Sequence, residues 1–187
     1  AKSIASFDCE YGFSCMGYEI SGAFGAAIAQ KDMKKIGRVI AMTGDGSYMM
    51  LNSDIYSAVL HGYPLTLILC DNGGFAVISR LQTGNGAASF RTMITENESA
   101  ARVDFVAHAK SMGANTHRVT SISELTKQLQ ATANSKEVEV IVIDTEPTTW
   151  TEGGAFWEVG IPEVSDKKSI QEARAKLIDG KKAQRKF

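Results

Sequence analysis

The sequence predicts an α/β protein with a three-layer fold, in which a parallel sheet carries helices on both faces. Three stretches are apolar almost without interruption, as expected for strands that are buried on both faces of a parallel sheet. They are GRVIAMTG at 37–44, LTLILC at 65–70 and VEVIVI at 138–143. Helix-like segments alternate with these strands, which is typical of a sheet covered on both sides. The 187 residues are enough for one domain with a sizeable core.

The remaining elements follow from local sequence. Small apolar residues at 18–30 predict a helix that packs closely against a neighbour. Ser47 is a suitable first residue for the next helix, and Gly62 and Pro64 mark its end. The polar, glycine-bearing stretch 82–99 is long for a loop, and such loops are often functional. The predicted helices are 18–30, 47–61, 103–112, 122–133 and 167–183, and a further short strand is predicted at 115–119.

Composition excludes several classes of function. The net charge of −1 does not suggest nucleic-acid or anionic-membrane binding. Three cysteines without a CxxC pair predict neither a disulfide framework nor a zinc site, and they favour a reducing compartment. No apolar run reaches the ~20 residues that span a bilayer. We therefore expect a cytoplasmic protein.

An aspartate stands between two glycines where the first strand ends. Gly44 and Gly46 let another group approach the backbone closely, and Gly46 and Ser47 would open the following helix. The N–H groups and positive dipole end of that helix favour a phosphate. An aspartate beside a phosphate is repulsive unless a cation lies between them. Asp45 therefore predicts a divalent metal that bridges the protein to a polyphosphate.

A second polar motif, DNGG at 71–74, follows the next strand. Asn72 comes 27 positions after Asp45, and a strand–helix–strand unit of that size returns to the same edge of the sheet. Asn72 would offer an amide oxygen, and the backbone of Gly73 and Gly74 a carbonyl oxygen. With phosphate oxygens and a water, these ligands form the hard-oxygen shell that Mg²⁺ or Ca²⁺ prefers.

This pair of motifs resembles the signature of thiamine-diphosphate enzymes, in which GDG is followed about 27 residues later by an Asn-Asn pair. Here the pair is Asp71-Asn72, so the chain departs from the family at the first position. The resemblance implies the thiamine-diphosphate-binding fold. It also implies that Asp45, Asn72 and the carbonyl of Gly74 bind Mg²⁺, and that Gly44, Gly46 and Ser47 hold the diphosphate.

An upstream segment, SCMGYEISGAFGAAIA at 14–29, resembles the GxMGxxxxxAxG segment of the synthase branch of this family. By that resemblance, Met16 would wedge under the cofactor and hold it bent, and the carbonyl of Ser14 would face the aminopyrimidine ring. The branch usually has glycine at the position of Ser14. Methionine suits a wedge because its side chain is large, apolar and adaptable.

Five further segments are similar to the trihydroxycyclohexane-dione hydrolase branch, which opens the ring of a cyclic 1,2-diketone in myo-inositol breakdown to give a 5-deoxy-glucuronate. They are EYGFSCMGYEISGA, GDGSYMMLNSD, DNGGF, LQTGNGAASF and FWEVGIPEVS. The resemblance implies a small-molecule substrate, with Gln82 and the 82–99 segment as candidate contacts and the FWEVG segment at 156–160 as a candidate cover. The sequence assigns no catalytic residue.

The resemblance also implies what this chain does not supply. In the family a glutamate activates the aminopyrimidine ring, and it comes from a pyrimidine-binding domain of the same or a neighbouring subunit. We therefore expect residues 1–187 to be a single diphosphate-binding domain, a C-terminal fragment of a longer chain that forms a homo-oligomer. By itself the chain would be catalytically silent.

Two alternatives remain open. One is another enzyme of the same cofactor class, such as an acetohydroxyacid-synthase-like carboligase or a 2-oxo-acid decarboxylase. Some decarboxylases place a proton-relay glutamate where this chain has Ile78, which disfavours that interpretation. The other is a non-catalytic domain that kept the fold and lost the cofactor, against which the intact Asp45 and Asn72 argue.

Overall fold

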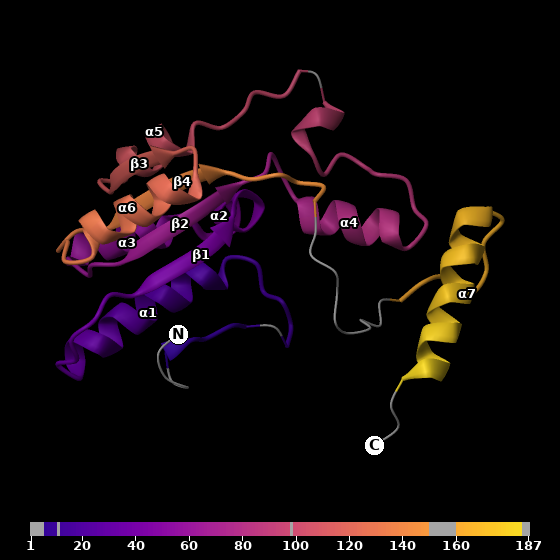
Figure 1. Ribbon diagram of the computed structural model, residues 1–187, viewed down its shortest axis with the longest axis horizontal. Helices are drawn as coiled ribbons and strands as arrows, with labels where there is room; N and C mark the ends of the chain where they lie inside the picture. The colour runs from indigo at the N-terminus through magenta and orange to yellow at the C-terminus, as the bar shows by residue number, and fades with distance from the viewer. Residues whose placement is uncertain (1–5, 11, 98, 150–159, 185–187) are drawn as a thin grey trace. The chain divides into compact units, whose positions relative to one another are not determined.

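The computed structural model describes residues 6–10, 12–97, 99–149 and 160–184 (Figure 1). Its contacts divide the chain into two units, which are described separately below. The first unit comprises Ala1–Asn72 and Ala101–Thr145, and the second comprises Gly73–Ala100 and Glu146–Phe187. Within the described ranges, no helix combines the length and the apolar character that a bilayer span requires.

A four-stranded parallel sheet forms the centre of the first unit. Its strand order is β1-β2-β4-β3. The strands are β1 (Ile40–Gly44), β2 (Thr66–Asp71), β3 (Asn115–Val119) and β4 (Glu139–Asp144). Gly44 pairs with Cys70, and Asp71 pairs with Asp144. The register therefore brings the C-terminal ends of β1, β2 and β4 to the same end of the sheet. Ligands of open α/β sheets bind beyond this end.

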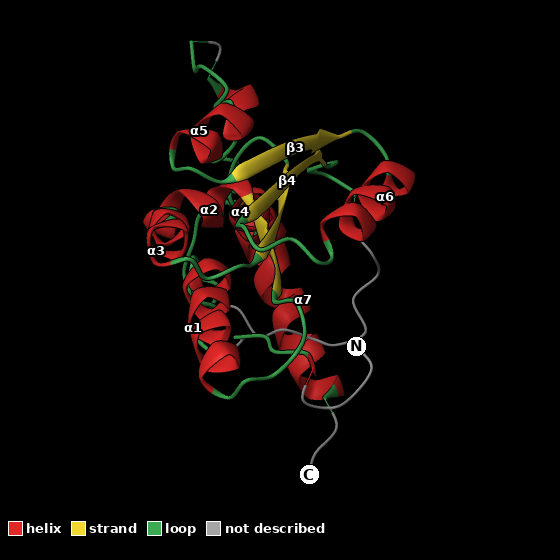
Figure 2. Cartoon of the chain, turned by 90° about the vertical axis from the view of Figure 1, so that its left-hand side faces the viewer, coloured by secondary structure: helices red, strands yellow, loops and turns green. Residues whose placement is uncertain are grey.

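Helices cover both faces of this sheet, as the apolar strands require. Figure 2 shows α1 (Tyr18–Asp32), α2 (Asp45–Leu51), α3 (Ser53–His61) and α5 (Phe105–Ser111) on one face and α6 (Ile122–Thr132) on the other. A hydrophobic core lies on each face of the sheet, and alternate residues of β2 pack into one or the other, because successive side chains of a strand point to opposite faces. Leu67 and Leu69 join the larger core, and Ile68 packs in the smaller core under α6.

The half-buried Arg38 holds together the amino-terminal end of the strands. The Arg38 guanidinium donates to the carbonyls of Leu65 and Ser135 at 2.8 and 2.6 Å and to the hydroxyl of Thr66 at 2.7 Å. Burial lowers the pKa of Arg38. This network lies at the end of the strands opposite to the predicted site, so its role is to hold the fold.

The second unit contains α4 (Ala76–Gly84), a 3₁₀ turn η2 (Ile94–Glu96) and α7 (Lys168–Ala183). The Ser169 hydroxyl of α7 donates to the carbonyl of Gly86 at 2.7 Å. A Cβ on Gly86 would come within 2.4 Å of the Ser169 carbonyl oxygen, and the φ of Gly86 is +83°. Glycine is therefore needed where the chain leaves α4 and meets the start of α7.

The observed fold confirms the predicted class and corrects some boundaries. The single helix expected at 47–61 is two helices that meet at Asn52, and the first begins at Asp45 rather than at Ser47. The loop expected at 82–99 contains the end of α4 and the turn η2. Helix α4 itself was not predicted, because no side chain caps its start at Phe75. Helix α7 confirms the charged helix expected at 167–183.

Candidate functional site

The structure brings Asp45 and Asn72 together at the carboxyl edge of the sheet. The backbone N–H of Asn72 donates to Oδ1 of Asp45 over 3.4 Å, which is a long hydrogen bond. Asp45 is only 5% exposed, although it carries a carboxylate. A buried carboxylate needs strong partners, and a cation is the strongest that such a site can take.

The charge of Asp45 also affects its surroundings. Burial, and secondly the Asp45 carboxylate, raise the pKa of the Cys70 thiol at the end of β2. The thiol is therefore protonated at neutral pH, and Cys70 is not an activated nucleophile. Among the described residues, no group of three His, Cys, Asp or Glu side chains is placed to bind a metal. The predicted ligand set needs one carboxylate, because its other protein donors are amide and carbonyl oxygens.

Space for a bound group exists beside Gly44. Its φ of −84° is one that any residue adopts, so its backbone does not require glycine. A Cβ built on Gly44 would meet no atom within 4 Å. The protein packing thus leaves open the volume that a side chain would fill, directly before Asp45. An anionic group held through a metal fits there, since the first N–H groups of α2 have no intrahelical acceptors.

The Ser47 hydroxyl joins the starts of α1 and α2. It accepts a hydrogen bond from the N–H of Gly17 at 3.1 Å and donates to the Glu19 carboxylate, whose two oxygens both lie at 3.2 Å. This hydroxyl is therefore engaged with α1. The predicted contact of Ser47 with a diphosphate would then fall to its backbone N–H in the first turn of α2.

Helix α2 is fixed from its far side as well. Tyr48 is fully buried, its hydroxyl lies 2.9 Å from Nδ1 of His108, and burial raises its pKa. A Cβ on Gly17, whose φ is +97°, would lie 2.8 Å from the Leu51 side chain. The buried Tyr48 and the close approach of Gly17 to Leu51 thus help to fix the helix that carries Asp45.

The loop before α1 contains Ser14 and Met16, which the resemblance places beside the organic part of the cofactor. Ser14 has a φ of +49°, a left-handed conformation that glycine adopts more easily. Glu10 accepts the N–H groups of Phe13 and Cys15 at 3.0 and 2.7 Å, and these bonds lower the pKa of Glu10. The loop is thus held in one shape, and the half-buried Met16 follows it directly.

Gly74 belongs to the second unit and forms an isolated antiparallel bridge with Met93. The bridge hydrogen bonds come from its neighbours, Phe75 N–H to the Thr92 carbonyl and Ile94 N–H to the Gly73 carbonyl. Gly74 is therefore a member of a non-hydrogen-bonded pair in this bridge. A Cβ at Gly74 would lie 2.4 Å from the Thr92 carbonyl oxygen, so only glycine fits.

The 82–99 segment is internally bonded. Gln82, the predicted substrate contact, accepts the N–H of Phe90 at 3.3 Å. Glu96 accepts the N–H groups of Thr92 and Met93 at 2.7 and 3.2 Å, and also the Ser89 hydroxyl. These bonds, chiefly the one from Ser89, lower the pKa of Glu96. Of the predicted cover at 156–160, residues 156–159 lie outside the described ranges.

Sequence reasoning missed one residue at this edge. Arg102 binds the Asp71 carboxylate, with Nη2 at 3.0 Å from Oδ1 and Nε at 3.3 Å from Oδ2. The sequence does signal that a cation is needed, because the Asp71 carboxylate stands at the end of a buried strand. The sequence does not say which of the basic residues supplies it.

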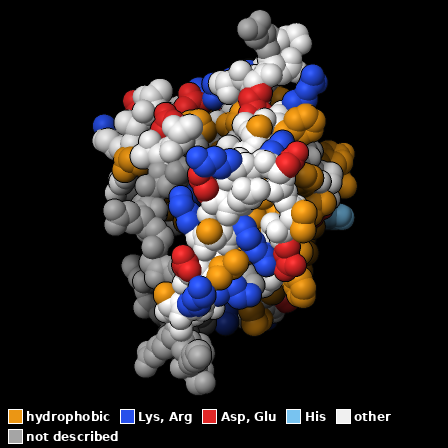
Figure 3. Space-filling model, turned by 90° about the vertical axis from the view of Figure 1, so that its right-hand side faces the viewer, with side chains coloured by type: hydrophobic (Ala, Val, Ile, Leu, Met, Phe, Trp, Pro, Cys, Tyr) orange, Lys and Arg blue, Asp and Glu red, His pale blue; other side chains and the backbone are white. Residues whose placement is uncertain are grey.

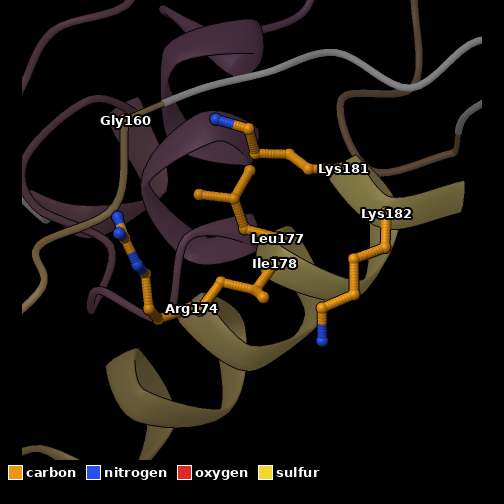
Figure 4. Close-up of a pocket in the computed structure, with 6 residues that line it drawn as sticks. All are labelled: Gly160, Arg174, Leu177, Ile178, Lys181 and Lys182. Carbon is orange, nitrogen blue, oxygen red and sulfur yellow. The ribbon is translucent and has the colours of Figure 1, made fainter. Parts of the chain in front are cut away.

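A hollow of about 400 Å³ lies along α7 in the second unit (Figure 4). None of the predicted site residues lines it, and its Arg174 guanidinium is engaged with the Ile161 carbonyl and with Glu163, both at 2.8 Å. On the face shown in Figure 3, Lys and Arg side chains are interspersed with Asp and Glu. The residues that line the hollow are Gly160, Arg174, Leu177, Ile178, Lys181 and Lys182.

The family model described as thiamine pyrophosphate enzyme, C-terminal TPP binding domain, matches residues 2–144. The chain is 38% identical over 177 residues to 3D-(3,5/4)-trihydroxycyclohexane-1,2-dione hydrolase 2 of Bacillus cereus, a match that covers 90% of this chain and 27% of that protein. It is 36% identical over 195 residues to the 3D-(3,5/4)-trihydroxycyclohexane-1,2-dione hydrolase of Geobacillus thermodenitrificans, a match that covers 100% of this chain and 30% of that protein. The chain thus spans less than a third of the length of these relatives.

A solved structure supports the fold. The thiamine diphosphate-dependent 4-hydroxybenzoylformate decarboxylase of Rhodococcus jostii RHA1 superposes with a TM-score of 0.56 at 20% identity, covering 70% of this chain and 23% of that one.

Proposed function

The chain belongs to the thiamine pyrophosphate enzyme family, as a C-terminal TPP-binding domain, and from this premise we propose that it supplies the diphosphate- and metal-binding half of a carbon–carbon bond hydrolase. The proposed substrate is a cyclic 1,2-diketone, the class that the curated relatives' names state. Its place in inositol breakdown is part of the proposal. The observation that carries the site is the hydrogen bond of Asn72 to the buried Asp45, 27 residues away.

In this proposal the metal ligands are the Asp45 carboxylate, the Asn72 side-chain oxygen and the Gly74 carbonyl. They suit Mg²⁺, which prefers hard oxygen ligands and retains phosphate and water in its shell. The buried position of Asp45 supports a bound cation, which would compensate its charge. The Gly74 carbonyl is included as the third ligand because the resemblance to the family signature implies it.

The diphosphate would lie against the first turn of α2. Gly44 would supply the open space, and the backbone N–H groups of Gly46 and Ser47 would donate to phosphate oxygens. Met16 would support the cofactor from below and the carbonyl of Ser14 would accept from its aminopyrimidine. Bound thiamine diphosphate supplies an electron sink for chemistry at a carbonyl carbon. This chain's residues bind and orient it.

The proposed partner is a pyrimidine-binding domain, in the same chain or a neighbouring subunit of a homo-oligomer. It would contribute the glutamate that activates the cofactor. Support comes from the large apolar side chains that α2, which begins at Asp45, and the following α3 expose, since such surfaces mark interfaces. They are Met49, Met50, Leu51, Tyr56 and Leu60. The proposed location is the cytoplasm, in line with the cysteine content.

The test of the reaction uses the full-length protein with thiamine diphosphate and Mg²⁺. We expect it to consume the cyclic dione and form a ring-opened acid, with no measurable turnover of pyruvate. Carboligation or decarboxylation of pyruvate in place of ring opening would favour the synthase-like or decarboxylase alternative. Turnover of the dione by the 187-residue chain without any other polypeptide would contradict the proposed division of the active site.

A further inference from the structure

Four charged residues form a cluster beside the proposed metal site, which we call the carboxyl-edge cluster: Asp71, Arg102, Arg118 and Asp144. Asp71 and Asp144 end adjacent strands and pair across the β2–β4 ladder. Like charges at directly opposed positions destabilise a sheet. Arg118 lies 2.8 Å and Arg102 3.5 Å from Oδ1 of Asp144, and Arg102 also binds Asp71.

The two carboxylates differ in their need for a cation. The Asp144 side chain is 60% exposed, whereas the Asp71 side chain is 0% exposed. A buried carboxylate that loses its partner is strongly unfavourable, while an exposed one is solvated. The Arg102 guanidinium contacts both carboxylate oxygens of Asp71, with Nη2 3.0 Å from Oδ1 and Nε 3.3 Å from Oδ2. The single ammonium group of lysine could not reproduce this two-point contact.

Asp71 directly precedes Asn72, the proposed metal ligand. The carbonyl of Asp71 accepts the N–H of Thr145 at 2.9 Å, which ties this end of β2 to the chain after β4. The Asn72 N–H meets Asp45 one residue further on. Without the Arg102 charge beside it, the Asp71 carboxylate would compete for a bound dication and repel a diphosphate. In this chain the residue directly before Asn72 carries a charge, and Arg102 is the cation that the structure places on it.

We propose that Arg102 is a positioning residue, which holds the buried Asp71 carboxylate away from the cation that Asp45 and Asn72 would share. This inference rests on the proposed metal and diphosphate site. It assigns to Arg102 no contact with substrate or cofactor.

The test measures two affinities of the purified protein, for Mn²⁺ alone by electron paramagnetic resonance and for thiamine diphosphate at saturating Mg²⁺ by calorimetry. Removing the Arg102 charge adds net negative charge beside the site. In Arg102→Gln we expect thiamine diphosphate to bind about tenfold more weakly, while Mn²⁺ alone binds at least as tightly as in the wild type. A merely structural loss would weaken both.

Rescue gives the sharper comparison. Asp71→Asn removes the charge that Arg102 holds, so Asp71→Asn/Arg102→Gln should return both affinities to within about twofold of the wild type. Arg118→Gln is the matched control, because it removes a cation from the exposed Asp144 and leaves the Asp71 pair intact. It should leave both affinities unchanged. Where Arg102→Gln fails to fold, Arg102→Lys tests the two-point contact with Asp71 alone, because it keeps the charge and loses the forked guanidinium. Thiamine diphosphate should then bind more weakly by less than about tenfold, and Asp71→Asn/Arg102→Lys should restore the wild-type affinity.

Three outcomes would overturn the inference: unchanged affinities in Arg102→Gln, a parallel loss of both, or a double variant as impaired as Arg102→Gln. If the wild type binds thiamine diphosphate in the presence of Mg²⁺, these outcomes contradict only the role of Arg102 and not the proposed function. A wild type without metal-dependent binding would instead refute the proposed site, and the role of Arg102 with it.

Discussion

The Ser47 hydroxyl accepts a buried hydrogen bond from the backbone N–H of Gly17 at 3.1 Å, which joins the start of α2 to the start of α1 across 30 residues. The same hydroxyl donates to Glu19. The helix that carries Asp45 and the loop that carries Met16 are therefore held by one side chain. This link couples the two parts of the proposed cofactor site.

Ser47→Ala should destabilise the fold by about 0.5–1.5 kcal/mol, because the Gly17 N–H loses one of its two acceptors and keeps the other, Glu19 Oε2, at 3.1 Å. Urea unfolding followed by circular dichroism measures this difference. Ser123→Ala on the exposed side of α6 is the control and should change stability by less than about 0.5 kcal/mol. Equal stability of the wild type and Ser47→Ala would mean that the link contributes nothing.

Ser14→Gly should stabilise the protein by about 1 kcal/mol, because a φ of +49° is strained for serine and permitted for glycine. Ser14→Ala provides the comparison, since alanine carries the same Cβ and should bring no gain. Thermal unfolding of the three proteins is sufficient. A loss of stability in Ser14→Gly would contradict this explanation of the family's glycine.

Gly44→Ala separates binding from folding. The added Cβ meets no protein atom, so stability should change by less than about 0.5 kcal/mol. Thiamine diphosphate should bind about tenfold more weakly or worse, because over-packing a close contact costs about 1–3 kcal/mol. Gly25→Ala, which is equally open but lies within α1, should leave affinity unchanged. Normal affinity in Gly44→Ala would place the diphosphate elsewhere.

The Glu139 carboxylate predicts a pH dependence of stability. Burial alone would raise its pKa, but hydrogen bonds from Ser135, Asn115 and His117 hold its pKa below the ordinary value. Its contribution is therefore present above the unfolded pKa of about 4.3 and is lost as the pH falls through the lowered folded pKa. The stability advantage of the wild type over Glu139→Gln should shrink as the pH falls below about 4.

Urea unfolding at a series of pH values measures this advantage directly. Glu137→Gln, at an exposed neighbouring position, should show no comparable change. An advantage that grows as the pH falls would reverse the sign and contradict the assignment.

Much of the fold could be predicted from sequence because its signals are local. Apolar runs give the strands of the sheet core, and Gly44 marks the end of β1 as expected. Helix α4 has no comparable signal, since its nine residues start at Ala76 and the preceding Phe75 provides no capping side chain. The break at Asn52 was also missed, because Asn52 keeps helical angles and the residues on both sides favour helix.

The order and direction of the strands predict which residues meet at the candidate site, but they do not predict how the side chains pair there. Parallel connections bring Asp45 and Asn72 to one edge, and the structure places them 3.4 Å apart between carboxylate and N–H. The pairing of Asp71 with Arg102 spans 31 residues and depends on how the chain before α5 crosses the sheet edge. No spacing rule encodes it. The same holds for the engagement of the Ser47 hydroxyl by α1.

The central claim is that Asp45 binds a dication that anchors the diphosphate, and calorimetric titration with thiamine diphosphate tests it most directly. The wild type should bind only when Mg²⁺ is present. Asp45→Ala and Asp45→Asn should each weaken that binding by about 100-fold or more, beyond the range of outer-shell residues, whereas Asp32→Ala on the exposed end of α1 should bind normally. Equal affinity of the wild type and Asp45→Ala, or binding that is indifferent to Mg²⁺, would contradict the account.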